Sequence, residues 1–347
     1  MNIPKNNKFY MPPEWHPHKC CWMQWPYDNP NHNSYGDVPS WSHFDFEKAK
    51  LTWANVAKSI SEFEKVKMIV HPNELKKAKN LLDSNIQIIE LKIDDCWARD
   101  SGAIFLLNDK NKLGGVDWEF NGWGKFQPFD SDNKIAKFMI ENSHASYFKN
   151  NMVLEGGSIH VDGEGTLLTT EQCLLNKNRN PNLSKKEIEK NLKDYLGINK
   201  IIWLKNGTDE GTDGHVDNIA CFVNSGTVLA LACKDKSDTF YEKINENLEI
   251  LKTSTDCKGK RIEVIELEMS YKRLIPNDDE PSSYVNFYIA NKGIVMPTFD
   301  DKKADDNAKN IIQSVFPDRK ILDINGIDIS MGGGNIHCIT QQEPKSV

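Results

Sequence analysis

Five side chains in this sequence are of types that can attack carbon, move a proton or hold a cation. They are one thiol, one imidazole and three carboxylates, on Cys338, His215, Asp100, Glu155 and Asp217. A cysteine thiolate is a strong nucleophile, and a histidine near neutrality transfers protons. Carboxylates match the planar fork of N–H donors on a guanidinium group. Together these types indicate a pocket in which a thiolate attacks the carbon of a bound guanidinium cation.

Cys338 follows a glycine-rich run at residues 331–335. The run leads into an apolar segment of strand character and has no Lys-Ser or Lys-Thr pair, so it does not resemble a phosphate-binding loop. A buried, inert cysteine is the structural alternative for an isolated thiol, but the polar neighbours Asn335 and His337 favour a site. Because neighbours in a strand point to opposite faces, we expect the base to come from elsewhere than His337.

His215 and Asp217 flank Val216 in an apolar segment. If the segment is a strand, alternation places both polar side chains on one face and Val216 on the other. The pair suits proton transfer, and a hydrogen-bonded structural histidine is the alternative. The sequence shows no cluster of His and Cys with metal-site spacing, so we expect no metal.

The other two carboxylates also have structural alternatives. Glu155 precedes two glycines in an apolar context, where a carboxylate is unfavourable without a partner. Asp100 follows Arg99, and a local turn closed by this pair would explain it equally well. The functional interpretation therefore depends on the combination of acids, thiol and imidazole.

The elements that must position these residues recur along the chain. Apolar segments of strand character begin near the candidate residues, at 102–107, 157–161, 216–223, 284–289 and 334–339. The first four are followed by Asn- and Gly-containing turns and a second apolar run, which predicts hairpins. Helical periodicity follows at about 45–63, 73–83, 131–147, 184–196, 237–252 and 303–315. Single strands are expected at 87–91, 200–204, 262–267 and 320–324.

A hairpin, a helix and a strand repeated about five times predict a closed α/β assembly with pseudo-symmetry. An ordinary α+β domain whose strands merely look alike is the alternative. No linker rich in Pro, Gly or Ser divides the chain, so we expect a single catalytic domain over residues 1–347. If the modules surround one axis, their equivalent ends converge on a central site.

Composition narrows the class of protein. The chain has 347 residues, a net charge of −7 and no apolar run long enough to span a membrane. Its polar start lacks a signal core, which favours the cytosol. Its eight cysteines include no C-x-x-C pair. The acidic balance argues against nucleic acid as a partner.

Several motifs are more specific than composition. They are MPPEW at 11–15, WMQWP at 22–26, WARDSG at 97–102, FNGWG at 120–124, EGGSIHVDGEGT at 155–166, TDGHVDN at 212–218 and GGGNIHCITQQ at 332–342. Through these motifs nearly the whole chain resembles the agmatine deiminase family, a peptidylarginine-deiminase-like family of the pentein superfamily. The resemblance implies a five-bladed α/β propeller of ββαβ modules with pseudo-five-fold symmetry. It also implies a hydrolase of linear amidines without a cofactor, assembled as a homodimer or larger homo-oligomer.

The resemblance further implies roles for the matching residues. Cys338 resembles the nucleophile, His215 the general acid and base, and Glu155 the acid that orients His215 and binds guanidinium nitrogens. Asp100 and Asp217 resemble the clamps on the guanidinium group. Two tryptophans resemble residues that shape the substrate pocket, and they are Trp97 and Trp123.

The substrate that the resemblance implies is agmatine, hydrolysed to N-carbamoylputrescine and ammonia through an amidino-thioether on Cys338, a step of putrescine biosynthesis. Arginine would add a carboxylate, which usually needs an Arg partner. Arg179 stays open as such a partner, and the acidic residues Asp209, Glu210 and Asp213 favour a positively charged far end. The alternatives are a deiminase of peptidylarginine, arginine or another guanidine, and a non-catalytic protein that binds polyamine-like cations.

Overall fold

The computed structural model describes residues 3–32, 34–35, 38–39, 44–274 and 280–347. Five small sheets follow one plan: an antiparallel pair of strands, with one of the two strands also paired in parallel to a third. A separate short pairing joins β2 (Ser34–Tyr35) to β3 (Val38–Pro39). The repeated plan confirms the predicted modules of hairpin, helix and strand.

Four modules are continuous in sequence. The first consists of β6 (Ile104–Leu107), β7 (Leu113–Glu119), α5 (Ile135–Asn142) and β8 (Ser146–Val153). The second consists of β9 (Ile159–Val161), β10 (Thr166–Thr170), α7 (Lys185–Leu196) and β11 (Lys200–Leu204). The third consists of β12 (Ala220–Asn224), β13 (Thr227–Ala232), α8 (Tyr241–Thr253) and β14 (Glu263–Glu268). The fourth consists of β15 (Tyr288–Ala290), β16 (Gly293–Thr298), α9 (Lys302–Val315) and β17 (Lys320–Asn325).

The fifth module is built from both ends of the chain. Its strands and helices are β18 (Thr340–Pro344), β1 (His18–Gln24), α1 (Phe46–Ser61), β4 (Lys65–Val70), α2 (Leu75–Leu81) and β5 (Gln87–Glu90). β18 runs antiparallel to β1, with Gln341 opposite Trp22. β1 is in turn parallel to β4. This pairing fixes the position of Cys338, which lies two residues before β18.

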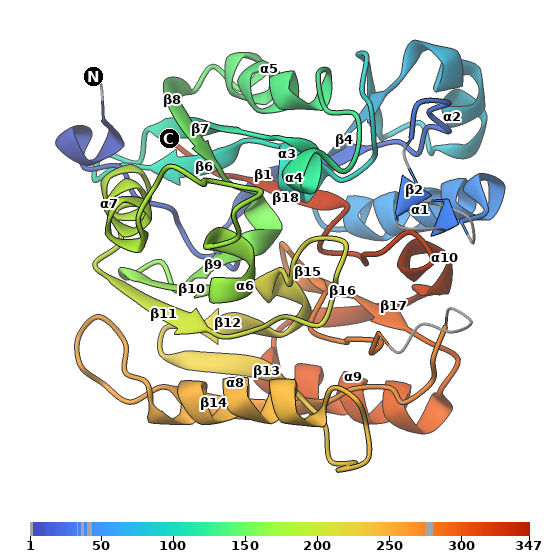
Figure 1. Ribbon diagram of the computed structural model, residues 1–347. Coiled ribbons are helices and arrows are strands. Elements are labelled where there is room, and N and C mark those ends of the chain that lie inside the picture. The colour runs from blue at the N-terminus through green and yellow to red at the C-terminus, as the bar shows by residue number, and fades with distance from the viewer. Residues whose placement is uncertain (1–2, 33, 36–37, 40–43, 275–279) are drawn as a thin grey trace.

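The helices of the five modules, α1, α5, α7, α8 and α9, lie on the outside of the molecule, and the sheets lie inside (Figure 1). Local sequence starts these helices in recognisable ways. Asp45 caps α1 by accepting bonds from the backbone N–H groups of Glu47 and Lys48. Ser184 and Glu187 form a capping box at the start of α7.

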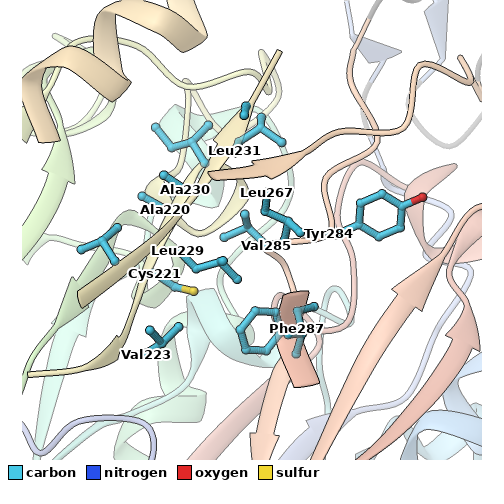
Figure 2. Close-up of a cluster of buried hydrophobic side chains, with 14 of the residues drawn as sticks. Ala220, Cys221, Val223, Leu229, Ala230, Leu231, Leu267, Tyr284, Val285 and Phe287 are labelled. Atoms are coloured by element: carbon cyan, nitrogen blue, oxygen red, sulfur yellow. The ribbon is translucent and has the colours of Figure 1, made fainter. Parts of the chain in front are cut away.

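Apolar side chains from neighbouring modules pack together between the sheets. Figure 2 shows one such cluster, in which Leu229 and Leu231 of β13 and Leu267 of β14 lie close to Val285 and Phe287. Each of these five residues is at most 2% exposed. The segment before β15 is therefore held in place by the core of the preceding module.

Two expectations about the elements were wrong. The helix expected at about 131–147 is shorter: a 3-10 turn over Asp132–Lys134 leads into α5, which ends at Asn142, and β8 follows. Exposed polar residues interrupt the apolar pattern of β8, which hides the strand in the sequence. The second error concerns the repeated segments, which do not begin as strands. In each module with a candidate site residue, the regular β-strand begins two to five residues after that residue.

No helix in the described ranges combines the length and the apolarity needed to cross a membrane.

Glu343 connects the closing strand β18 to its surroundings. Its carboxylate is buried and accepts hydrogen bonds from Trp22 Nε1 at 2.9 Å and Ser143 Oγ at 2.7 Å. Lys19 Nζ lies 2.7 Å away. Burial alone would raise the pKa of Glu343, but the bonds from Lys19 and Ser143 hold it below its ordinary value.

Replacing Glu343 with Ala should lower the free energy of unfolding by about 3 kcal/mol, because the buried donors Trp22 Nε1 and Ser143 Oγ would be left without an acceptor. Lys19, Trp22 and Ser143 would lose their shared acceptor. Urea unfolding near neutral pH measures the change.

Glu171→Ala is the matched control, because Glu171 bridges two lysines at the surface, Lys185 and Lys205. Exposed pairs of this kind contribute about 1 kcal/mol or less. If the two variants lost equal free energy of unfolding, Glu343 would not be important for holding β18 in the fold.

Candidate active site

Equivalent positions in four of the five modules supply the candidate residues. Asp100 lies in α3 (Ala98–Ser101) before β6, and Glu155 lies just before the 3-10 turn η4 (Gly156–Ser158) that leads into β9. His215 precedes the 3-10 turn η5 (Val216–Asn218), which contains Asp217. Cys338 lies in the turn before β18. The structure thus brings together the five residues that the sequence singled out.

The local geometry expected for His215 and Asp217 was wrong. They do not alternate along a strand, because residues 216–218 form η5 and β12 begins only at Ala220. Both side chains nevertheless reach Gly157, as a Cβ atom added there would lie 2.6 Å from His215 Nδ1 and 3.0 Å from Asp217 Oδ2. The same atom would lie 2.9 Å from Asp100 Oδ1. Gly157 is therefore the point over which three candidate side chains meet.

Asp100 is held by fixed donors. Gly157 N and Trp123 Nε1 each donate to its carboxylate at 3.0 Å. Its Oδ1 lies 3.7 Å from His215 Nδ1. Burial raises the pKa of Asp100 to about 6, and the nearby Asp217 and Glu155 carboxylates act in the same direction.

Glu155 has the partner that its apolar context requires. Arg179 Nε donates to Glu155 Oε1 at 2.6 Å, and both side chains are fully buried. Arg179 Nη1 also binds Asp213 at 2.6 Å. Although burial opposes ionisation, the Arg179 guanidinium and His215 lower the pKa of Glu155 to about 2. Arg179 is thus committed to orienting the site.

His215 lies between two acids. Its Nε2 is 3.9 Å from Glu155 Oε2, and its Nδ1 faces Asp100. Burial disfavours the imidazolium, but the Asp100 carboxylate and the neighbouring Cys173 and Glu155 raise the pKa of His215 well above its ordinary value. The geometry therefore favours a protonated His215 in the site without substrate.

The thiol of Cys338 is buried among acceptors. Its Sγ lies 3.5 Å from Asp217 Oδ2, and Asn286 Nδ2 donates to it at 3.2 Å. Burial raises the pKa of Cys338 well above its ordinary value, and the Asp217 and Asp100 carboxylates raise it further. The resting site therefore favours the neutral thiol.

Asn286 is a site residue that sequence reasoning missed. It precedes β15, the position in the fourth module that corresponds to Cys338 in the fifth. Its Oδ1 accepts from His337 N at 2.9 Å, so the amide aligns the segment that carries the thiol. The repeat contained the necessary signal, because 284–289 was the one segment without an assigned polar residue.

A pocket opens above these groups. Its empty space is about 510 Å³, including the part open to solvent. Its lining residues are Trp97, Asp100, Trp123, Phe126, Gln127, Asp209, Gly211, Thr212, Gly332, Gly333 and Cys338. Trp123 adopts a left-handed backbone conformation with φ of 51°, beside Gly124 with φ of 90°. This strained turn lets the indole both line the pocket and donate to Asp100.

Within the part of the chain that the structure describes, two buried groups of three residues have donor atoms close enough for a metal ion. Glu14, His160 and His337 form one group, and Glu155, Cys173 and His215 form the other. The sequence spacing did not reveal either group. In each group a guanidinium already binds the carboxylate, Arg99 on Glu14 and Arg179 on Glu155. That arrangement suits a hydrogen-bond network better than a metal, since the guanidinium repels a second cation.

Comparisons with known proteins agree with the fold. A family model described as Porphyromonas-type peptidyl-arginine deiminase matches residues 10–344. A protein of Pseudomonas aeruginosa strain UCBPP-PA14 named agmatine deiminase is 42% identical over 99% of this chain and 97% of its own. The solved agmatine deiminase of Enterococcus faecalis aligns with a TM-score of 0.91 and 37% identity, over 100% of this chain and 99% of that chain.

The solved agmatine deiminase of C. jejuni with substrate bound aligns with a TM-score of 0.85 and 28% identity, over 98% of this chain and 97% of that chain. The five modules and these neighbours define an α/β protein of the pentein fold, as expected. The chain belongs to the Porphyromonas-type peptidyl-arginine deiminase family.

Replacing Arg179 with Gln should lower the free energy of unfolding by about 3–5 kcal/mol at neutral pH, because it leaves Glu155 buried without its cation. In the wild type the stability from Glu155 is present above its ordinary pKa of 4.5 and is lost as the pH falls towards about 2. The variant should lack this contribution. Urea unfolding as a function of pH measures it.

Arg273→Gln is the control, since Arg273 pairs with Asp238 away from the pocket and its side chain is 24% exposed. It should cost about 1 kcal/mol. An Arg179→Gln variant as stable as this control would show that Glu155 does not depend on Arg179.

Proposed function

We propose that this protein is an agmatine deiminase, which hydrolyses agmatine to N-carbamoylputrescine and ammonia through an amidino-thioether on Cys338. The observation that carries the proposal is a buried thiol surrounded by ionisable acids at the base of an open pocket. A guanidinium cation supplies the charge that this arrangement lacks. The agmatine deiminases similar to this chain support the same reaction.

The free atoms of the site match the substrate. Glu155 Oε2, His215 Nε2 and Asp217 Oδ1 are buried, and among the described residues none of these three atoms has a hydrogen-bond partner. Two of them are carboxylate oxygens, which accept the N–H groups of a guanidinium in a fixed orientation. Burial makes such contacts costly to leave unmade, so substrate binding relieves an unfavourable state.

The first chemical step uses the substrate charge. A guanidinium bound between Asp100 and Asp217 opposes the carboxylate charge that raises the pKa of Cys338, and so favours the thiolate. The thiol proton is released to solvent, and the thiolate forms a bond to the guanidinium carbon. His215 donates a proton to one terminal nitrogen, the carbon–nitrogen bond breaks, and ammonia leaves.

The second step restores the enzyme. His215, now neutral, takes a proton from a water molecule, whose oxygen bonds to the amidino carbon. The carbon–sulfur bond breaks, the sulfur takes the proton of the new hydroxyl group and becomes the thiol again, and the neutral ureido product departs. Glu155 orients His215 in both steps. The departing ammonia takes up the proton released from the thiol in solvent, and His215 and Cys338 carry the other proton transfers.

The lining of the pocket favours a cationic group over a carboxylate at the distal end of the substrate. Asp209 is buried and lines the pocket, while none of the described lining residues is Arg or Lys. Arg179, the arginine that could have met a substrate carboxylate, instead binds Glu155 and Asp213. We infer that the primary ammonium of agmatine points towards Asp209, and that free arginine is a poorer substrate.

The family is named for peptidyl-arginine deiminases, so a peptide substrate is the second candidate. It uses the same chemistry at Cys338 and differs only at the far end. A peptide backbone carries no cation for Asp209, which makes that residue the discriminating observation.

Cys338→Ala should abolish ammonia release from agmatine while retaining guanidinium binding, because only the nucleophile is removed. Wild-type enzyme should have a higher kcat/KM for agmatine than for arginine or a peptidyl-arginine. Ammonia release measures all three reactions, with Cys257→Ala as a control in a half-exposed thiol outside the pocket.

A wild type that prefers arginine or the peptide would retain the mechanism and overturn the substrate. Turnover remaining in Cys338→Ala would exclude Cys338 as the nucleophile. Binding of agmatine without ammonia release by the wild type would support the non-catalytic cation-binding alternative.

Asp209→Asn should raise the KM for agmatine by about tenfold with little change in kcat, because the distal ammonium loses roughly 1.4 kcal/mol of charge attraction. Glu210→Gln is the matched control, being the adjacent acid of the same loop but exposed. Steady-state kinetics on agmatine measures both variants. Equal KM values in the two variants would show that Asp209 does not bind the distal ammonium.

A further inference from the structure

A chain of buried ionic contacts continues from the site into the interior. His337 Nδ1 lies 2.8 Å from Asp217 Oδ2, and His337 Nε2 lies 2.8 Å from Glu14 Oε1. The exposed fractions of Glu14, Asp217 and His337 are 4%, 2% and 3%. Glu14 comes from the N-terminal segment before β1, so the contact joins both ends of the chain beside the thiol.

The protonation state of His337 follows from its hydrogen-bond partners. A neutral imidazole has one N–H donor and one acceptor nitrogen, whereas an imidazolium has two donors. Both ring nitrogens of His337 face carboxylate oxygens at hydrogen-bond distance. Only the imidazolium satisfies both contacts when both carboxylates are ionised.

The other charged groups near Glu14 are consistent with a protonated His337. Arg99 Nη1 donates to Glu14 Oε1 at 3.1 Å, which keeps Glu14 ionised. His160 Nε2 lies 3.6 Å from Glu14 Oε2, while His160 Nδ1 accepts from the backbone N–H of Phe222 at 3.2 Å. A ring nitrogen that accepts an N–H carries no proton, so His160 is neutral in this arrangement.

The pKa shifts agree with the geometry. Burial and Arg99 oppose the charge on His337, but Glu14 and Asp217 raise its pKa above the ordinary value. Burial also opposes ionisation of Glu14 and Asp217, yet the contacts with His337 lower the pKa of both carboxyls.

We propose that Glu14 and His337 are positioning residues: His337, as an imidazolium between Glu14 and Asp217, holds Oδ2 of Asp217 and offsets the charge of that carboxylate at the Cys338 thiol. The role in substrate turnover depends on the proposed function. The proton state of His337 and its effect on the thiol do not.

The two oxygens of Asp217 divide these tasks. Oδ2 meets both His337 and Cys338 Sγ, while Oδ1 is buried and has no partner among the described residues. Without a cation at His337, the negative charge of Asp217 would act on the thiol unopposed. The thiolate would then form less readily, but the pocket would attract a guanidinium at least as strongly.

The Glu14→Gln variant tests the proposed role of Glu14 and His337. It removes the negative charge of Glu14 and retains a side chain of the same shape. The variant should lower kcat for agmatine by about tenfold without raising KM, since one unit of thiol pKa is a tenfold change in thiolate. The pH at which iodoacetamide alkylates Cys338 at half its maximal rate should rise by about one unit. Peptide mass spectrometry distinguishes Cys338 from the other thiols.

Glu64→Gln is the matched control. Glu64 is another buried carboxylate that binds a histidine, with His18 Nδ1 at 3.2 Å and Tyr288 Oη at 2.7 Å. It should leave kcat, KM and the alkylation profile unchanged. Glu14→Asp, which retains the charge, should recover most of the activity lost in Glu14→Gln.

Nitrogen-15 NMR of the histidine rings in ligand-free wild type tests the proton state without any variant having to fold. Both ring nitrogens of His337 should be protonated at pH 7 to 8, with the signal assigned by correlating the ring with the backbone amide of His337 in the wild type. A neutral His337, or a Glu14→Gln variant that raises KM with kcat and alkylation unchanged, would overturn the proposal. If the wild type fails to hydrolyse agmatine but its NMR and alkylation results are as expected, the proposed function is wrong, and the proposed effect of His337 on the Cys338 thiol is supported.

Discussion

The structure of the site depends on one electrostatic constraint: carboxylates buried close to a thiol are stable only if cations are buried with them. An isolated ionised carboxyl in a dry interior is highly unfavourable. Here each critical acid has a positive neighbour. Arg179 binds Glu155, His337 binds Asp217 and His215 lies beside Asp100.

This constraint explains why distant parts of the chain meet at the site. Arg179 follows the second module's hairpin, whereas Glu14 and Arg99 reach His337 from the N-terminal segment and from α3. None of these pairs is local in sequence. The modular fold makes them possible because the segment before the first strand of each module reaches the same central region.

The sequence predicted the modules because their signals are local. Turn residues, apolar runs and helix caps are recognised within a few positions, and the four continuous modules follow from them. The sequence predicted the fifth module only in part, because β1 and β4 come from the opposite end of the chain to β18. β8 was hidden by its exposed polar positions.

The candidate site was predictable as a set of residues but not as a geometry. Asp100, Glu155, His215, Asp217 and Cys338 stand beside the repeated segments, so the repeat itself pointed to them. Their partners depend on three-dimensional contacts that no spacing encodes. Because the segment at 334–339 was predicted as a strand, His337 was expected to point away from the site. It lies in a turn, and its side chain contacts Asp217.

The same constraint gives the site a means of linking selection to reactivity. In the absence of substrate, burial and two carboxylates keep Cys338 as a thiol, which is a weak nucleophile. Only a ligand that brings positive charge to Asp100 and Asp217 changes that balance. A neutral molecule of similar shape would leave the buried acceptors unsatisfied and the thiol protonated. In the proposed mechanism, the groups that recognise a guanidinium are therefore also the groups that make the Cys338 thiol available as a nucleophile.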